Sequence, residues 1–581
     1  MQTRRSLTVP AAAVAALILF AIILVAALST RILNAFEVHA ALQVLPSQPP
    51  SLPSDQAHVG TSDAPTPVLS DRLKEQMDRD LTEVTVAQLQ NFYAQRKYSV
   101  RDVVSWYLNR IADLNPKFRP FVYVYGKEAL ARADREDTVA RQGKPAGTLW
   151  GVPIIIKGST CIAGKITASG WEGYARPHLE FIATRNATIV EKLQQAGAIV
   201  LGHANMPDLG KSDTNVSSLG GRTGNAYNHD FSPGGSSGGV AVAVALNLAV
   251  IGQGSDTGNS IRNPSSNASV VGVFPTEGLV SVAGIHPYDP LLDNTGPIAR
   301  TVRDAALALD TMSGKDPDDP RTAHSVPHKG KRSYTEFLKT NALKGRRFGV
   351  PKFILDGSPA LYPNETYYHR GVSPPTRAIF MQAVQKLRAA GATIVFDDDL
   401  LTEKFALKAD SFQTKPYRER AIDRFLNIYA PEQINSLAKL NQQGIELPVE
   451  RFTDGVAQTT IESDPKAASN YYEPRRQLIE MYRSTLRKYR LDGFVYPALQ
   501  VPPNDERNPL PKDYPTDGPY SFSNWVNRLG TPSVVVPAGY YANGLPFGIE
   551  FSADFWKDGD LLGYAYAFEQ STHVRHAPVP R

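Results

Sequence analysis

Amphipathic stretches alternate with short apolar runs over most of this 581-residue chain. Apolar residues recur at spacings of three and four, which predicts helices, at 86–96, 100–114, 127–142, 187–196 and 376–390. Short runs rich in β-branched and aromatic residues, which predict strands, occur at 121–125, 151–156, 198–201, 393–396, 493–496 and 533–536. Because strands and helices alternate, we expect an α/β fold with a large, mixed, mostly parallel twisted sheet covered by helices on both faces.

The most apolar stretch lies near the N-terminus. Residues 9–28 form a run of twenty residues without a charged side chain, which is long enough for a helix to cross a bilayer. Two arginines precede this run, within residues 1–8, so the positive-inside rule predicts a cytoplasmic n-region and a lumenal or extracellular remainder. We therefore expect residues 9–28 to be a signal anchor or a signal peptide, giving a single-pass membrane protein or a secreted one.

The composition changes after this apolar segment. Residues 29–74 contain a Pro- and Ser-rich stretch with little to bury, which predicts a stalk. No internal linker divides residues 75–581, so we expect one large domain there. Within it, residues 404–475 are polar and helical with no obvious strand, and we interpret them as an insertion that covers a substrate site.

Charge and cysteine content narrow the possible partners and sites. The formal net charge is only +5 and is not gathered into a basic block, which argues against a nucleic-acid partner. Cys161 is the single cysteine, so the chain can form no internal disulfide and no zinc site built on cysteine pairs, and we expect a buried, inert thiol. The sequence predicts no metal and no organic cofactor.

Four Asn-X-Ser/Thr sequons would meet the glycosylation machinery if the domain is lumenal or extracellular. Asn364 lies in a loop rich in Pro and Tyr and is the best candidate, and Asn186 and Asn215 are further candidates. Asn267 follows a serine-rich loop so closely that we expect it to be buried.

Two clusters of Gly and Ser, at 234–239 and 254–260, flank an almost unbroken run of small apolar residues. Glycine permits backbone angles and close approaches that other residues exclude, so two hydroxyl-bearing loops can be held against one buried element. Ser236 and Ser260 stand 24 residues apart in these clusters. Either cluster alone could be an ordinary turn, but the pair predicts a site that holds serines and backbone N–H groups in place.

A serine needs a base to act as a nucleophile, and the sequence offers two arrangements. Residues 235–239 match the GxSxG elbow around Ser237, and His573 or His576 could complete a Ser-Asp-His triad. The other base is Lys157, which ends the aliphatic run GVPIIIK and would lose its charge if it were buried. Position alone favours a Lys157 side chain that reaches solvent.

Read together, four ordered motifs closely resemble the amidase signature family. They are GVPIIIK at 151–157, ATIVEKLQQAGAIVLGHANMPDL at 187–209, GNAYNHDFSPGGSSGG at 224–239 and GSDTGNSIRNPS at 254–265. Weaker likeness begins near Thr85 and ends with GTPSVVVPAGYYANGLPFGIEF at 530–551. The likeness therefore covers nearly the whole domain and is specific for the family but not for a substrate.

The resemblance implies a Ser-Ser-Lys relay. In it Ser260 is the acylated nucleophile, Ser236 is a bridging serine after a non-proline cis peptide, and Lys157 is the final base. The family pattern places an oxyanion hole in the backbone N–H groups of Thr257, Gly258, Asn259 and Ser260. Two further residues would support this loop by hydrogen bonds, namely Asp256 and Arg262.

Two positions depart from the family pattern, which commonly has Asp where this chain has Gly158 and Gly where it has Asn259. All three relay side chains are present, so we expect a serine amidohydrolase that cleaves a small linear, non-peptide amide into acid plus ammonia or amine, with water as second substrate. Three alternatives stay open: a subunit of an amidotransferase, a fatty-acid-amide type of hydrolase suggested by the predicted anchor, and a catalytically dead binding protein. The sequence does not indicate the oligomeric state.

Overall fold

The computed structural model describes residues 62–143, 147–325, 332–357, 371–448, 450–453, 455–507 and 523–579. No helix within these ranges is long and apolar enough to cross a membrane. The predicted anchor at 9–28, most of the predicted stalk and the sequon at Asn364 lie outside the described residues.

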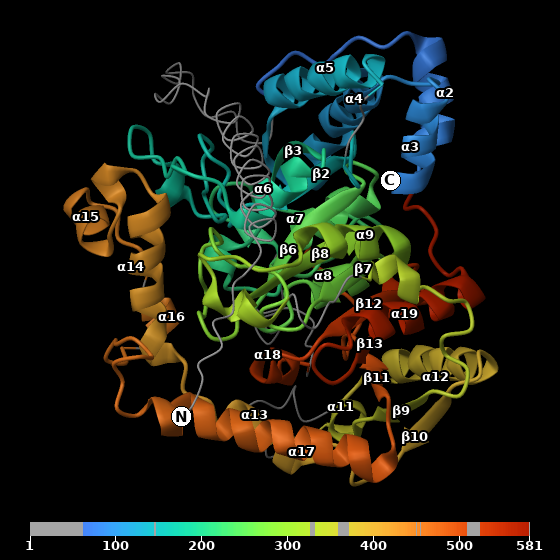
Figure 1. Ribbon diagram of the computed structural model, residues 1–581, viewed down its shortest axis with the longest axis vertical. Coiled ribbons are helices and arrows are strands. Elements are labelled where there is room, and N and C mark those ends of the chain that lie inside the picture. The colour runs from blue at the N-terminus through green and yellow to red at the C-terminus, as the bar shows by residue number, and fades with distance from the viewer. Residues whose placement is uncertain are drawn as a thin grey trace, which may run out of the picture. The chain divides into compact units, whose positions relative to one another are not determined.

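An eleven-stranded mixed sheet forms the centre of the fold (Figure 1). Its spatial order is β1 (Phe121–Val124), β3 (Ile199–Ala204), β2 (Pro153–Lys157), β6 (Ile251–Asp256), β8 (Asn294–Ala299), β7 (Val271–Phe274), β12 (Ser533–Tyr540), β13 (Pro546–Ser552), β11 (Gly493–Pro497), β9 (Arg347–Val350) and β10 (Thr393–Phe396). A separate small ladder joins β4 (Val216–Ser217) to β5 (Gly221–Arg222). The predicted α/β fold with a large mixed sheet is confirmed.

Parallel pairing lies toward the two flanks of this sheet. β3, β2 and β6 are parallel to one another, and so are β11, β9 and β10. The strands between these groups pair antiparallel, because β12 and β13 form a hairpin without an intervening helix and β8 lies between β6 and β7. Parallel pairs are therefore a smaller share of the sheet than the alternation of helices and strands predicts.

Helices pack on both faces of the sheet (Figure 1). One layer contains α7 (Gly238–Ala245) and α8 (Arg262–Asn267), and the other contains α6 (Thr188–Gln195), α9 (Val302–Met312), α12 (Pro374–Ala389) and α19 (Asp558–Thr572). The N-terminal helices are α2 (Asp71–Leu81), α3 (Val86–Ala94), α4 (Val100–Phe118) and α5 (Gly126–Arg141). The remaining helices are α11 (Lys352–Asp356), α13 (Glu403–Asp410), α14 (Arg418–Tyr429), α15 (Leu437–Gln442), α16 (Glu450–Thr453), α17 (Glu473–Tyr489) and α18 (Trp525–Leu529).

The folded part of the chain begins earlier than predicted. Ser70 caps α2 by accepting a hydrogen bond from the Leu73 N–H, so the expected boundary at residue 74 falls inside a helix. Asp63 donates its backbone N–H to the Val124 carbonyl at the edge of the sheet. The stalk interpretation is therefore wrong for residues 62–74, because this segment is ordered by pairing, by capping and by the packing of Leu69 and Leu73 against the hydrophobic core.

Close packing of α7 against β6 sets the two Gly/Ser clusters beside each other. Every residue of α7 is buried, which its small side chains Gly, Ala and Val allow. A Cβ added to Gly252 of β6 would lie 2.2 Å from Val240 Cγ1 of α7, so only glycine permits this approach. Because α7 starts after the first cluster and β6 runs into the second, the packing brings the candidate serines together.

Candidate active site

Lys157 is the last residue of β2, and its side chain is only 1% exposed. Its Nζ lies 2.7 Å from Ser236 Oγ and 3.1 Å from the Ser255 carbonyl oxygen, and it donates to both. The side chain therefore points into the protein, and the alternative that it reaches solvent is wrong.

Burial changes the acid–base behaviour of this lysine. Loss of hydration lowers the pKa of Lys157 from 10.5 to about 7, while the carboxylates of Asp256 and Asp293 partly oppose the shift. Half of the Lys157 side chains are then neutral near pH 7, which is the form that can take a proton from a hydroxyl.

The first Gly/Ser cluster presents Ser236 to the lysine. The Gly235–Ser236 peptide bond is cis, as the family resemblance implies. Gly235 lies against backbone, because an added Cβ would be 2.6 Å from the Ser212 carbonyl oxygen and 2.7 Å from that of Thr214. The Ser237 N–H then donates to the Ser260 carbonyl at 3.1 Å, which joins the two clusters directly.

The geometry excludes the GxSxG elbow. Ser237 is fully buried, and its Oγ donates to the Ser255 carbonyl oxygen at 3.2 Å rather than to a histidine. His576 stacks on Tyr540 with ring centroids 4.1 Å apart, and His573 ends α19. Neither histidine contacts Ser237 within the described part of the chain, so the predicted alternative base does not form.

Residues 257–260 connect the end of β6 to the start of α8. Among the described residues, none of their four backbone N–H groups donates a hydrogen bond to a protein acceptor. Free N–H groups clustered in one short loop are what an oxyanion hole requires. Ser260 itself is half-buried and begins the turn into α8.

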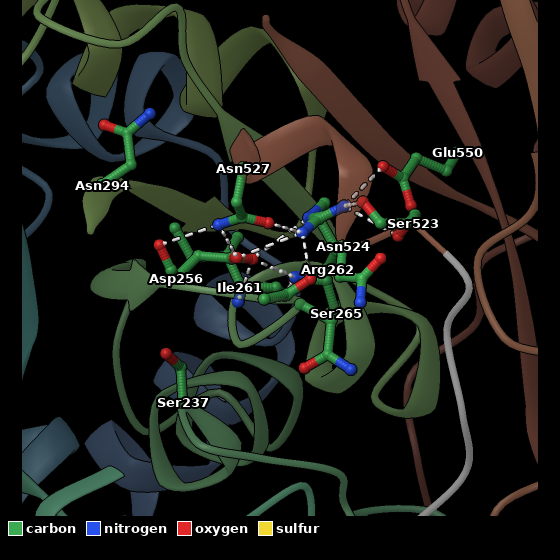
Figure 2. A network of polar contacts seen from close by, with 12 residues as sticks. Ser237, Asp256, Ile261, Arg262, Ser265, Asn294, Ser523, Asn524, Asn527 and Glu550 are labelled. Atoms are coloured by element: carbon green, nitrogen blue, oxygen red, sulfur yellow. Dashed lines mark hydrogen bonds and ion pairs between the residues drawn. The ribbon is translucent and has the colours of Figure 1, made fainter. Parts of the chain in front are cut away.

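A buried ion network supports this loop from behind (Figure 2). Asp256 accepts from the Ile261 N–H at 2.8 Å and from Arg262 Nε at 3.1 Å. Arg262 Nη2 also donates to the Gly258 carbonyl oxygen at 2.6 Å, so the guanidinium spans the loop. Burial alone would raise the pKa of Asp256, but the charge and hydrogen bonds of Arg262 outweigh it and hold that pKa below its ordinary value.

Three residues complete the network from the C-terminal part of the chain. Glu550 Oε1 accepts from Arg262 Nη1 at 3.0 Å, and the Ser523 carbonyl accepts at 2.9 Å. Asn527 Nδ2 donates to Asp256 Oδ1 at 2.9 Å. Figure 2 shows these groups converging on Arg262. The sequence indicated Asp256 and Arg262 as supports but gave no signal for their partners.

A cavity of about 740 Å³ opens above Lys157 and Ser236. Thr257 of the second cluster is also part of the wall. Ser260, which follows Thr257 in the sequence, is not. Much of the wall is apolar or aromatic, and its other members include Ile285, His286, Leu291, Phe425, Ile428 and Tyr429. Three of these come from α14, so the segment 404–475 does line the candidate site.

Residues 102–562 match the sequence model of the Amidase family. The chain belongs to the amidase family. It is 29% identical over 514 residues to a glutamyl-tRNA(Gln) amidotransferase subunit from Acinetobacter baylyi, covering 86% of this chain and 99% of that one. The native peptide amidase of Stenotrophomonas maltophilia is 30% identical with a TM-score of 0.71, covering 86% of this chain and 99% of its own. An amidase family protein from Bacillus anthracis is 26% identical with a TM-score of 0.70, covering 88% and 95% of the two chains.

The structure shows what surrounds Gly158 and Asn259, the two positions that depart from the amidase pattern. A Cβ at Gly158 would lie 2.8 Å from the Ala204 carbonyl oxygen, so a larger side chain would require the neighbouring strand to shift. Asn259 is buried, and its Nδ2 donates to Asp213 at 3.0 Å. The asparagine therefore links the loop at 257–260 to the segment that packs against Gly235.

Asp293 is a site residue that sequence reasoning missed. It lines the cavity, accepts a 2.5 Å hydrogen bond from Thr257 Oγ1, and accepts from the Tyr288 N–H at 2.9 Å. Burial raises its pKa to about 7. It directly precedes β8 with no pattern that marks it as functional, so only the fold brings it to Thr257.

Within the described part of the chain, two of the four sequon asparagines are buried. Asn215 is fully buried and donates to Thr223 Oγ1 at 2.7 Å, so the prediction that it carries a glycan is wrong for the folded chain. Asn267 is buried, as expected. Asn186 is half-buried and accepts from the Ala163 N–H at 2.8 Å, and its modification stays a prediction.

Two other expectations concern Cys161 and metal binding. Cys161 is buried, and burial raises the pKa of its thiol, which accords with the expected inert role. Within the described residues, no group of three or more His, Cys, Asp and Glu side chains is arranged to hold a metal ion.

Proposed function

We propose that this amidase hydrolyses a small carboxylic amide to an acid and ammonia or an amine through an acyl-Ser260 intermediate. The observation that carries the proposal is the buried Lys157 with its Nζ 2.7 Å from Ser236 Oγ. A lysine with a pKa of about 7 in contact with a serine hydroxyl is a suitable general base. Membership of the amidase family supports cleavage of a C–N bond.

The proposed chemistry is a proton relay through Lys157, Ser236 and Ser260. Neutral Lys157 accepts a proton from Ser236 Oγ, and Ser236 in turn accepts one from Ser260 Oγ, which attacks the amide carbon. The free N–H groups of residues 257–260 would then stabilise the oxyanion, each contributing about 3 kcal/mol. The same relay returns a proton to the departing nitrogen, and water releases the acid from Ser260.

Two enzyme alternatives concern the substrate and the fate of the ammonia. The likeness to a glutamyl-tRNA(Gln) amidotransferase favours glutamine-type amide chemistry with ammonia delivered to a second site, and stable co-purification with other polypeptides would support that role. A fatty-acid-amide type of enzyme would be favoured if the proposed anchor at 9–28 keeps the domain at a membrane. N-terminal sequencing of the mature protein tests whether that segment is an anchor or a cleaved signal peptide.

A fluorophosphonate, which reacts with activated serines, tests the central proposal. We expect the intact mass of the full chain to increase by one adduct, and peptide mapping to place it on Ser260. Ser260→Ala should abolish the adduct and amide turnover, whereas Ser237→Ala should retain the adduct on Ser260. An adduct on Ser237 would restore the elbow chemistry, and no adduct on folded protein would indicate a dead relative that only binds.

A further inference from the structure

Four charged side chains that line the cavity neutralise one another in two ion pairs. Arg185 pairs with Asp318, and Arg321 Nε donates to Asp319 at 3.0 Å. Two lining arginines differ, because among the described residues Arg420 and Arg424 form no ion pair and no hydrogen bond. The cavity therefore contains positive charge that no described residue of the protein uses.

The position of these two arginines on α14 is informative. They stand one helical turn apart, and Ala421, Phe425 and Ile428 of the same helix line the same cavity. Ile422 and Leu426 of α14, which do not line the cavity, pack into a buried cluster with Tyr174 and Phe181. Arg420 and Arg424 therefore line the cavity while also being exposed to solvent.

Acidic groups are distributed differently around the cavity. Asp293 lies at the catalytic end, where it is hydrogen-bonded to Thr257, and would repel an anion there. Glu462 is exposed on a separate segment and forms no ion pair with a described residue. A substrate anion is therefore favoured only on the α14 side, with the aliphatic and aromatic wall between it and Lys157.

We propose that Arg420 and Arg424 bind a carboxylate of the substrate, so that the preferred substrate is an amide with an apolar segment between the scissile bond and a terminal carboxylate. Two arginines one helical turn apart have Cβ atoms about 5–6 Å apart. Their guanidinium groups can therefore bind one carboxylate through several charge-assisted hydrogen bonds. This inference rests on the proposed function, because it names the substrate class of the same site.

The test compares amides that differ only at the far end of the acyl chain. The substrates are the mono-p-nitroanilides of succinic, adipic and suberic acids, each paired with the p-nitroanilide of butyric, hexanoic or octanoic acid. We expect at least one dicarboxylic member to have a kcat/KM about 10- to 100-fold above its neutral partner, with a KM that rises with salt. The double variant Arg420→Gln/Arg424→Gln should reduce this ratio toward one.

Matched variants separate the local effect from a general change in charge. Arg72→Gln/Arg135→Gln removes two exposed arginines outside the cavity wall and should keep the ratio of the unmodified protein. Glu462→Gln removes the opposing charge and should increase the ratio. An equal kcat/KM for both members of every pair, or a preference that persists without Arg420 and Arg424, would overturn the proposal.

A binding measurement keeps the inference independent of turnover. Calorimetric titration of Ser260→Ala with the monoamides of adipic and suberic acids should show affinity that hexanamide and octanamide lack and that the double arginine variant loses. If Ser260 of the unmodified protein takes no fluorophosphonate, the proposed hydrolysis fails while this titration still decides the carboxylate site. If the titration shows no preference for the carboxylate, the inference fails whatever the result for Ser260.

Discussion

Replacing Lys157 with methionine should remove the base and at the same time reduce the energetic cost of burying it. Methionine has nearly the length of lysine but no charge, and position 157 is only 1% exposed. The difference between the ordinary lysine pKa of 10.5 and the buried value of about 7 corresponds to about 5 kcal/mol in favour of the neutral form.

The sign of the pH dependence follows from proton binding. The pKa of Lys157 is lower in the folded protein than in the unfolded chain, so the unfolded chain binds more protons between these values. Its contribution to stability is full above about pH 10.5, decreases as the pH falls, and is lost at about pH 7 and below. Between about pH 9 and about pH 6, the free energy of unfolding should therefore fall by roughly 3 kcal/mol more in the unmodified protein than in Lys157→Met.

Urea unfolding at these two pH values measures the effect. The methionine variant also loses the hydrogen bonds from Nζ to Ser236 and Ser255, but that loss contributes equally at both pH values and cancels from the comparison. Lys386→Met, on the exposed face of α12, is the control and should show no pH-dependent difference from the unmodified protein. A difference between Lys157→Met and the unmodified protein that stays constant from high to low pH would refute the reasoning, because Lys157 would then keep its charge in the fold.

Three further predictions concern the labelling of Ser260 and the buried network behind its loop. The rate of fluorophosphonate labelling of Ser260 should fall about tenfold for each pH unit below about pH 7, and a rate that is flat down to acidic pH would exclude Lys157 as the base. Arg262→Met should lower the free energy of unfolding in urea by about 3–5 kcal/mol, because Asp256 and Glu550 are left buried and unpaired, and an unchanged stability would contradict the network. Asn259→Ala removes the hydrogen bond to Asp213 and should slow labelling of Ser260 roughly fivefold. An unchanged labelling rate in that variant would mean that the asparagine only fills space.

Features that depend on neighbouring residues in the sequence could be predicted from the sequence. The aliphatic run before Lys157 predicts a strand at 151–156, and the strand is observed at Pro153–Lys157. The Gly/Ser clusters correctly indicated paired loops around a buried element. The strand β6 was not predicted, because Gly254 and Ser255 are typical of a loop, whereas here they belong to a strand that packs against α7.

The remaining site residues could not be predicted because their partners are distant in the sequence. Glu550 contacts Arg262 across 288 positions, and Asn527 contacts Asp256 across 271. Neither carries a local pattern, since one lies in an otherwise apolar strand and the other in a short helix. Arg420 and Arg424 are similar, because an arginine on a polar helix predicts a solvated face, and only the fold shows that these exposed side chains also line a cavity.

Two buried cations in this fold solve the same electrostatic problem in opposite ways. Arg262 stays charged because two carboxylates contact its guanidinium directly, and they raise its pKa despite complete burial. Lys157 has no carboxylate within ion-pair distance among the described residues, only a hydroxyl and a carbonyl, so burial lowers its pKa instead. A carboxylate brought into contact with Lys157 would stabilise the fold and remove the base, so the absence of such a partner is itself a requirement of the proposed chemistry.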